Sequence, residues 1–214
     1  MENQYKSWLW EKLAEKTVKN LKKHQFDAYF FQSSDEAFTF IMDTVSGHET
    51  FGFGGSDTTH TLNLPDALEK KGKTVYDHNK EGLSPEQNVD FRKKQFSSDC
   101  FFCSANAISA TGEIVNVDGV GNRTNAMSFG PKKVIIVAGM NKVAHDLESA
   151  LKRIREVAGP MRAKSLGMDT PCAKTGICED CNAPMRICRI TTILHRKPMM
   201  TDVSVVLINE ELGY

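Results

Sequence analysis

The sequence predicts an α/β fold: a mainly parallel sheet flanked by helices, with a β-hairpin excursion and a C-terminal cysteine-rich loop. Short β-prone runs alternate with helical patterns over the first 160 residues, which is typical of parallel sheets. Two apolar runs around a Thr-Gly turn predict the hairpin. The 214 residues suffice for a single domain. Within it, residues 1–48 form an N-terminal helical part and residues 165–195 a cysteine-rich metal-binding segment.

Helices and strands alternate in the predicted first half. Apolar spacing predicts a helix over residues 5–23, and residues 27–31 are β-prone. Ser33 and Glu36 have the spacing of a capping box and begin the next helix. The remaining elements of this half are a strand at 49–53, a glycine-rich turn into a helix at 54–59, a short helix from 64 that Gly72 ends, a strand at 74–76, and a helix that starts at Ser84-Pro85.

The second half carries the hairpin, a buried strand and a long helix. The hairpin lies within residues 105–117, and residues 133–138 form the strand. Asn141 is a candidate cap for a helix with an apolar face over 143–157, which Gly159-Pro160 ends. Sixteen of the eighteen Phe, Trp and Tyr residues lie at or before Phe102. Residues 160–198 therefore need a source of order other than aromatic packing.

Charge and hydropathy exclude two classes of partner. Basic and acidic residues number 27 each and the pI is about 7, so there is no net positive field to attract nucleic acid. The chain starts with polar, amphipathic residues instead of a basic and apolar leader. Its longest apolar runs, 134–138 and 203–208, are far shorter than the ~20 residues that span a bilayer. We expect a cytoplasmic protein with reduced thiols.

The cysteines form the strongest candidate site. Four of the six follow the spacing C-x5-C-x2-C-x6-C, namely Cys172, Cys178, Cys181 and Cys188. Clustered thiols in a reducing compartment favour a soft metal, and an iron–sulfur cluster, of the 4Fe-4S type, is the preferred interpretation. Structural zinc is the alternative, and free or disulfide-forming cysteines are a third. Arg186 and Arg189 either offset the charge of a thiolate cluster or are simply solvated.

Another pair, Cys100 and Cys103, has C-x2-C spacing without a second pair nearby. It is either a redox or metal pair or two small residues buried in a strand.

Two loops are candidates for binding a small anionic ligand. The first offers backbone N–H groups and hydroxyls at a helix start, and the second offers amides, a carboxylate and a guanidinium that clamps anions. Both should leave the same sheet edge and border one cleft. The alternatives are a tight strand–helix connection and a polar turn. The candidate residues are Gly54, Gly55, Ser56 and Thr58 in the first loop, and Asn116, Asp118, Asn122, Arg123 and Asn125 in the second.

Three segments together resemble the LUD (lactate-utilisation) domain family. They are Gly54-Gly55-Ser56-Asp57-Thr58, the stretch 105–115 around Thr111-Gly112, and the stretch 121–142 that contains Gly130-Pro131 and Gly139. The cysteine segment resembles that of a small, cysteine-bearing branch of the family. The resemblance implies a bacterial protein with a fold like that of the ribose-phosphate isomerase and CoA-transferase superfamily. It also implies a part in L-lactate oxidation by an iron–sulfur assembly.

The chain departs from the family pattern at one place. The wider family commonly has an acidic residue before Thr-Gly in the hairpin, and this chain has Ala110 there. A general acid or base at this position is lost unless Glu113 replaces it.

Our leading hypothesis is an iron–sulfur protein of lactate or hydroxyacid metabolism that binds a small anionic metabolite. It is either an oxidoreductase or a subunit of one. The alternative is a non-redox binding or transferase-like module for a phosphorylated or CoA-type ligand, with a structural zinc site. A third possibility is a subunit that docks an iron–sulfur or dehydrogenase partner protein. We expect a homodimer and no nucleic-acid or membrane partner.

Overall fold

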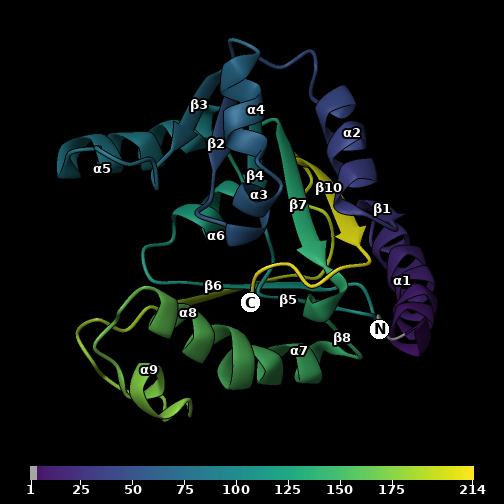
Figure 1. The fold of residues 1–214 in the computed structure, drawn as a ribbon, viewed down its shortest axis with the longest axis vertical. Helices are drawn as coiled ribbons and strands as arrows, with labels where there is room; N and C mark the ends of the chain where they lie inside the picture. Colours follow the sequence, from purple (N-terminus) through teal and green to yellow (C-terminus); the bar gives the residue numbers. More distant parts are fainter. Residues whose placement is uncertain (1–3) are drawn as a thin grey trace.

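A six-stranded parallel sheet forms the centre of the molecule in the computed structural model, which describes residues 4–214 (Figure 1). All neighbouring strands pair in parallel. Their order is β1 (Asp27–Phe31), β10 (Asp202–Ile208), β7 (Lys133–Gly139), β4 (Cys100–Cys103), β2 (Thr50–Phe53) and β3 (Thr74–Asp77). The predicted α/β class with a mainly parallel sheet is therefore confirmed.

Strand β7 shows that the main sheet is covered on both faces. Its side chains alternate, so Val134 and Ile136 join one hydrophobic cluster and Ile135 and Val137 join another. The first cluster includes residues of the helix α1 (Gln4–Lys23), and the second includes residues of α2 (Ser34–Thr44). A strand covered on both faces has to be apolar almost throughout, as β7 is.

A smaller, four-stranded sheet contains the predicted hairpin. Its strand order is β8 (Val143–Ala144), β5 (Ala107–Ser109), β6 (Ile114–Asp118) and β9 (Ile190–Leu194). Strands β5 and β6 are antiparallel around the Thr-Gly turn, and β9 pairs antiparallel to β6. Because β9 follows the cysteine segment directly, this pairing fixes the end of that segment beside β6.

The caps of several helices match the sequence pattern. Ser33 accepts a hydrogen bond from Glu36 N, and Ser84 and Gln87 form a complete capping box. The remaining helices are α3 (Asp57–Thr61), α4 (Leu64–Lys70), α5 (Pro85–Lys94), α6 (Asn122–Ala126), α7 (Leu147–Arg153), α8 (Gly159–Ser165) and α9 (Pro171–Thr175), with short 3₁₀ turns η1 (Gln95–Ser97) and η2 (Met140–Lys142).

The predicted long helix from Asn141 to Gly159-Pro160 is wrong at both ends. The residues after Asn141 first form β8, and Asp146 caps α7 by accepting from Ser149 N. A π-helical turn, η3 (Ile154–Ala158), then joins α7 to α8. Pro160 lies in the first turn of α8, where an N–H donor is not required, and the wider π turn accommodates the change of register.

None of the helices described for residues 4–214 combines the length and the apolar character needed to cross a bilayer.

Candidate functional site

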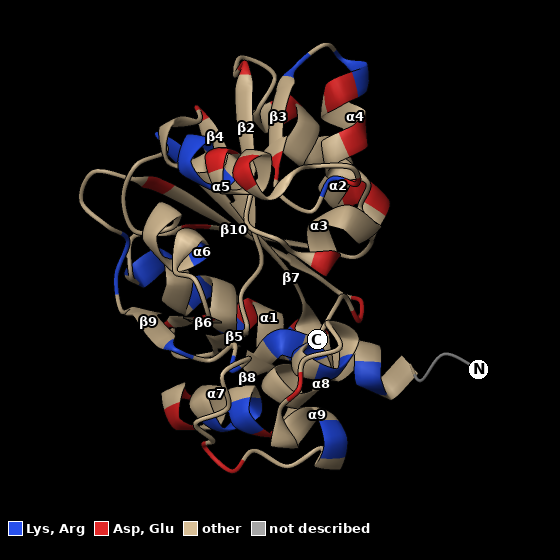
Figure 2. Cartoon of the chain, turned by 90° about the vertical axis from the view of Figure 1, so that its left-hand side faces the viewer, with Lys and Arg blue, Asp and Glu red and all other residues tan. Residues whose placement is uncertain are grey.

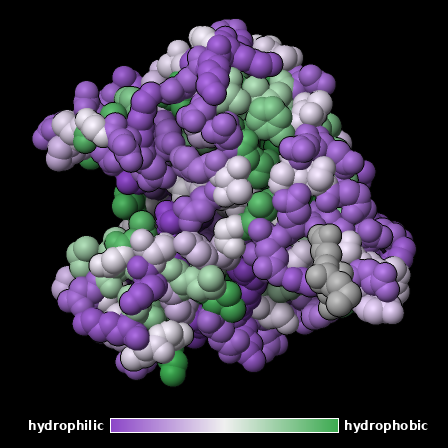
Figure 3. All heavy atoms as spheres, in the orientation of Figure 1, coloured by the Kyte–Doolittle hydropathy of each residue, from purple (hydrophilic) through white to green (hydrophobic). Residues whose placement is uncertain are grey.

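A cavity of about 850 Å³ lies between the carboxyl edge of the main sheet and the layer formed by α7, η3 and α8. In Figure 3 the surface is indented between the lobe that carries α5 and the lobe that carries α8 and α9. Segments that follow β2, β3, β4 and β7 all line it. The chain runs outward from β2 to β3 and then returns to β4, so the crevice lies at a switch in strand order, where α/β sheets typically bind ligands.

The turn after β2 forms one wall. Gly54 N donates to Phe102 O at 2.8 Å. A side chain at Gly54 is excluded, because a Cβ there would lie 2.9 Å from the ring of Phe101. Gly55 has a φ of +71°, which favours glycine. Gly54, Gly55 and Ser56 all line the cavity, and the Ser56 side chain caps α3 by accepting from Thr59 N.

Thr58 lies behind this wall and holds a lysine. It is fully buried and does not line the cavity, but its Oγ1 accepts a hydrogen bond of 2.9 Å from Lys142 Nζ. Lys142 Nζ also donates to Ser104 Oγ at 3.0 Å. Lys142 and Ser104 line the cavity, although each is only 4% exposed. Burial, together with the nearby guanidinium groups, lowers the pKa of Lys142 to about 7.

The second loop is organised by an ion pair. Arg123 Nη2 lies 2.6 Å from Asp118 Oδ1, and their side chains are 13% and 8% exposed. Arg123 also donates to Asn106 Oδ1 and Val117 O, and Asp118 Oδ2 accepts from Thr124 N. Both charged residues line the cavity. Arg123 is thus a partly buried side chain whose Nε and Nη2 are hydrogen-bonded, and not the exposed loop residue that its sequence context indicates.

The three asparagines of this loop lie in different places. Asn122 lines the cavity, where its Oδ1 accepts from Arg92 Nη1 at 3.2 Å. Asn116 is fully buried and holds the hairpin by accepting from Asn106 N and donating to Ser104 O. Asn125 is exposed and does not line the cavity. The structure therefore brings the glycine turn together with Asp118, Asn122 and Arg123, but not with Asn116 or Asn125.

An ion pair joins the two sides of the cavity. Arg162 Nη1 of α8 contacts both carboxylate oxygens of Asp57 in α3, at 2.9 and 2.8 Å. The lining includes seven Lys and Arg but only four Asp and Glu residues. Figure 2 shows the basic positions on α5, α6, α7 and α8, the helices around the cavity. This excess of positive charge suits an anionic ligand.

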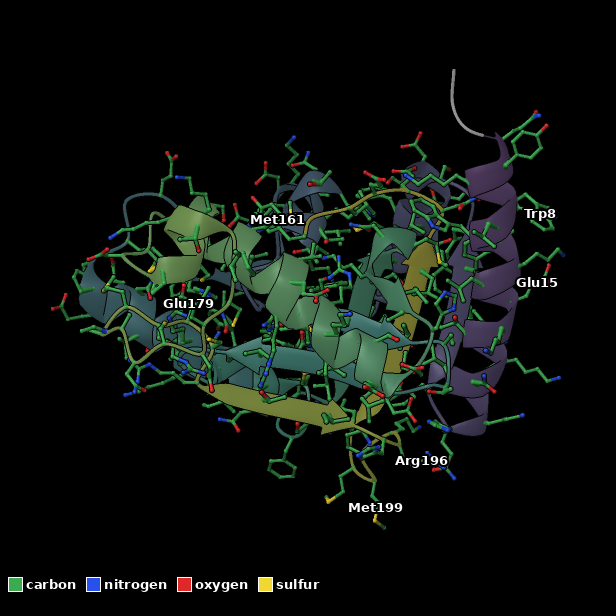
Figure 4. The ribbon with its side chains drawn as sticks, turned by 90° about the horizontal axis from the view of Figure 1, so that it is seen from below. Trp8, Glu15, Met161, Glu179, Arg196 and Met199 are labelled. Atoms are coloured by element: carbon green, nitrogen blue, oxygen red, sulfur yellow. The ribbon has the colours of Figure 1, made fainter. Side chains whose placement is uncertain are left out.

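All four cysteines of the C-terminal segment line this same cavity. Cys172 lies in α9, and the other three lie in the irregular stretch that Glu179 marks in Figure 4. Each thiol is free and half-buried. The backbone of the segment packs closely on the second loop: a Cβ at Gly119 would lie 3.3 Å from Ile187 Cα.

Arg186 holds the cysteine segment in shape. Its Nη1 donates to Cys181 O at 2.6 Å, its Nε donates to Cys188 O at 2.8 Å, and its Nη2 pairs with Asp180. The hydrogen bond that Arg186 donates to Asp180, followed by the charge of Cys188, raises the pKa of Arg186. Arg186 thus brings together the backbones of two cysteines that are seven positions apart.

The donor chemistry of this segment fits a thiolate-bound metal or cluster. The thiols are not gathered around one point: within residues 4–214, no three His, Cys, Asp or Glu side chains form an arrangement that could hold a metal ion. Residues 177–183 have no regular secondary structure. Cys178 and Cys181 therefore lie outside any helix or strand, whereas Cys172 belongs to α9.

The other candidate residues have structural surroundings. Cys100 and Cys103 are buried in β4, and burial raises the pKa of Cys103 to about 12. Neither lines the cavity. Glu113 accepts from Thr111 Oγ1 in the hairpin turn and is also absent from the lining, so it does not supply an acid or base there.

His60, behind the cavity wall, pairs with Asp77 at 2.6 Å. The hydrogen bond that His60 Nε2 donates to Asp77 raises the pKa of His60, against the opposing effect of burial.

The sequence interpretation missed Lys142, His78 and Arg92 as lining residues. Lys142 follows the buried strand β7 by three residues, at the sheet edge where ligands bind, and this position is a usable signal. His78 comes directly after β3 and so lies at the same edge of the sheet. Burial lowers its pKa to about 4, so its imidazole is neutral at pH 7. Arg92 lies in the last turn of the polar helix α5 and has no comparable signal.

Comparison with known proteins agrees with this architecture. The chain is similar to a DUF162 family protein from Deinococcus radiodurans, whose crystal structure was solved at 1.70 Å resolution. The TM-score is 0.54 and the identity 12%, with 93% of this chain and 98% of that chain covered. No curated protein matches the sequence. The family model of the LUD domain matches residues 14–208, which include both sheets and the cysteine segment, and the chain therefore belongs to the LUD domain family.

Proposed function

We propose that the protein binds a small anionic metabolite in the cavity and holds an iron–sulfur cluster on the cysteines beside it, as part of lactate or hydroxyacid metabolism. The observation that carries the proposal is the shared lining: the glycine turn, Arg123 and all four cysteines border one cavity. A ligand bound there would lie next to the thiols without any rearrangement of the sheet.

The charge distribution supports an anionic ligand. Arg92 lines the cavity and donates to Asn88 and Asn122, and within residues 4–214 no carboxylate lies within ion-pair distance of its guanidinium, although the charge of Asp118 acts on it from further away. A guanidinium that lacks a carboxylate partner can form a charge-assisted, bidentate pair with a ligand carboxylate or phosphate. Arg123 and Arg162, by contrast, are already paired with Asp118 and Asp57. Arg92 is therefore the best candidate for direct contact with the ligand.

The four thiols would supply all protein ligands of a cluster: Cys172, Cys178, Cys181 and Cys188. A cluster held by four thiolates provides one-electron transfer. Its negative charge would lie near Arg186, which already links Cys181 to Cys188. Electrons need an acceptor outside this chain, so the proposal includes an iron–sulfur or dehydrogenase partner protein.

A series of Cys→Ser variants of these four residues, purified without oxygen, tests the proposal. Iron, acid-labile sulfide and zinc are measured together with the proteolysis of residues 165–195. We expect iron and sulfide in the wild-type protein and their loss in each variant, with faster cleavage of the segment and intact N-terminal helices. Cys100→Ser is the matched control, since this buried thiol does not line the cavity. Wild-type protein that holds no metal under these conditions contradicts the proposal.

The cavity volume favours one second candidate. A space of about 850 Å³ is near the upper end of typical small-molecule sites and exceeds what a three-carbon acid fills. A phosphorylated or CoA-type ligand would occupy more of it, with the cysteines holding structural zinc. Zinc without sulfide in the same metal analysis would favour this non-redox, transferase-like function over the first.

A further inference from the structure

A lysine lies at the edge of the cavity without any of the partners that lysines usually have when buried. Lys142 is 4% exposed, and within residues 4–214 no carboxylate lies within ion-pair distance of its Nζ. Its two hydrogen-bond partners are the hydroxyls of Thr58 and Ser104. A buried charge without a counter-ion is costly, so this environment favours the neutral amine.

The geometry suits the neutral form. A neutral amine has two N–H bonds and one lone pair, whereas an ammonium has three N–H donors and no lone pair. The two oxygens at 2.9 and 3.0 Å accept two N–H bonds. The lone pair of the neutral amine then stays free for a reacting group. Since Lys142 lines the cavity, that group can be a bound ligand.

Charged groups on four surrounding elements act on this amine. After burial, the largest influences on the pKa of Lys142 are Arg153 of α7 and Arg123 of α6, which lower it, Asp57 of α3, which raises it, and Arg162 of α8, which lowers it. Three cations thus oppose protonation and only one anion favours it. The same positive field attracts an anionic ligand.

We propose that Lys142 is a nucleophilic amine that forms an imine with the carbonyl carbon of a 2-oxo acid bound in the cavity. This inference rests on the proposed binding of a small anionic metabolite and names its class. A 2-oxo acid combines the carboxylate that the basic lining favours with the carbonyl that an amine attacks.

The reaction balances without an external oxidant or reductant. The lone pair of Lys142 Nζ forms a bond to the carbonyl carbon, and the C=O π electrons move to the oxygen. The nitrogen loses a proton and the oxygen gains one, which gives a carbinolamine. A further proton from solution lets the oxygen leave as water, and the product is a protonated imine. Ser104 Oγ, 3.0 Å from Nζ, is placed to relay a proton between nitrogen and oxygen.

Reductive trapping tests this proposal. The protein is incubated with pyruvate and sodium cyanoborohydride, and intact mass and peptide mapping locate the reduced adduct. We expect one adduct per chain, on Lys142, and its loss in Lys142→Gln. Lys164→Gln is the control, because Lys164 is exposed on α8 and does not line the cavity. Adduct spread evenly over surface lysines, with Lys142 unmodified, overturns the proposal.

Two further measurements do not depend on the folding of a variant. In the wild-type protein, the trapping rate at Lys142 should rise up to a pH of about 7 and then level off. A surface lysine with the ordinary pKa of 10.5 continues to gain reactivity above that pH. Pyruvate should label Lys142 about tenfold faster than acetone, since one charge-assisted contact is worth roughly a factor of ten. A rate that still rises at pH 9, or equal labelling by acetone, contradicts the assignment.

The metal content of the same preparation distinguishes a failure of this proposal from a failure of the proposed iron–sulfur cluster. An adduct on Lys142 in protein that holds no iron, sulfide or zinc supports the amine and refutes the cluster. Iron and sulfide in a protein that gives no adduct refute the amine and leave the cluster supported.

Discussion

Arg123 illustrates how a residue that looks like a ligand clamp can be part of the framework. Its guanidinium contacts Asp118, Asn106 and Val117 O, and these contacts tie the loop after β6 to the segment after β4. Removing it leaves the carboxylate of Asp118 buried with Thr124 N as its remaining donor. Breaking a buried pair from one side typically costs several kcal/mol.

We therefore expect Arg123→Ala to lower the free energy of unfolding by about 3 kcal/mol. Arg155→Ala is the control, because Arg155 also lines the cavity but is exposed, and its removal should change stability by less than about 0.5 kcal/mol. Urea denaturation followed by circular dichroism measures both. If the two variants are equally stable, the pair with Asp118 does not support the loop.

At this scale, the sequence predicts contacts between near neighbours best. The caps at Ser33 and Ser84 are correct, because each depends on residues three positions away. Lys142 and Thr58 are 84 positions apart, and only the strand order brings them together. The contact between Lys142 and Thr58 therefore could not be predicted from the sequence alone.

Strand β7 and the turn that follows it depend on one glycine. A Cβ at Gly139 would lie 2.4 Å from Glu210 O and 2.7 Å from Leu212 N, so the chain after β10 passes directly over this position. Leu212 O in turn accepts from Thr58 Oγ1, the hydroxyl that holds Lys142. The glycine thus supports the lysine through two intervening contacts.

Gly139→Ala should lower the free energy of unfolding by about 2 kcal/mol, because the contacted atoms are backbone and cannot rotate away. It should also slow the trapping of pyruvate on Lys142. Gly47→Ala is the control, since a Cβ there has no neighbour within 4 Å. Thermal melts and the trapping assay serve as readouts, and a Gly139→Ala protein as stable and reactive as the Gly47→Ala protein would disprove this coupling.

Helices and strands that have their own turn or apolar pattern can be predicted from this sequence. Those that exist only because they pair with a distant strand cannot. The hairpin of β5 and β6 has its own turn and apolar pattern. Strand β8 has two residues and exists only because β5 accepts it as a parallel neighbour. Its presence shifts the start of the next helix from Asn141 to Asp146. The π turn before Pro160 likewise has no sequence signature, because Gly-Pro more often ends a helix than continues one.

In the whole molecule, stability should be distributed unevenly. The central strands β7 and β10 are buried on both faces, whereas residues 177–183 have no regular structure and few buried side chains. Figure 4 shows α9 and this stretch at one end of the molecule and α1, marked by Trp8 and Glu15, at the other. Local opening should therefore start at the cysteine end.

We expect amide hydrogen exchange to be slowest in β7 and β10 and fastest in residues 177–183. Reconstitution with iron and sulfide should slow exchange in residues 177–189 and leave α1 unchanged, because bound metal restricts only the chain that ligates it. Exchange followed by peptide mass spectrometry provides the measurement. Equal slowing along the whole chain would show that the segment is not a separate unit of stability.

The floor and the roof of the cavity have different origins in the chain. The floor comes from four separate segments that follow strands of the main sheet, whereas α7, η3, α8, α9 and the cysteines lie in one continuous stretch, residues 147–188, of the connection between β7 and β10. Mutations in residues 147–188 can lengthen that stretch or replace its thiols while every strand keeps its register. Evolution can therefore exchange the chemistry above the ligand independently of the pocket below it, and related chains that lack these cysteines would be expected to retain the lysine and the glycine turn.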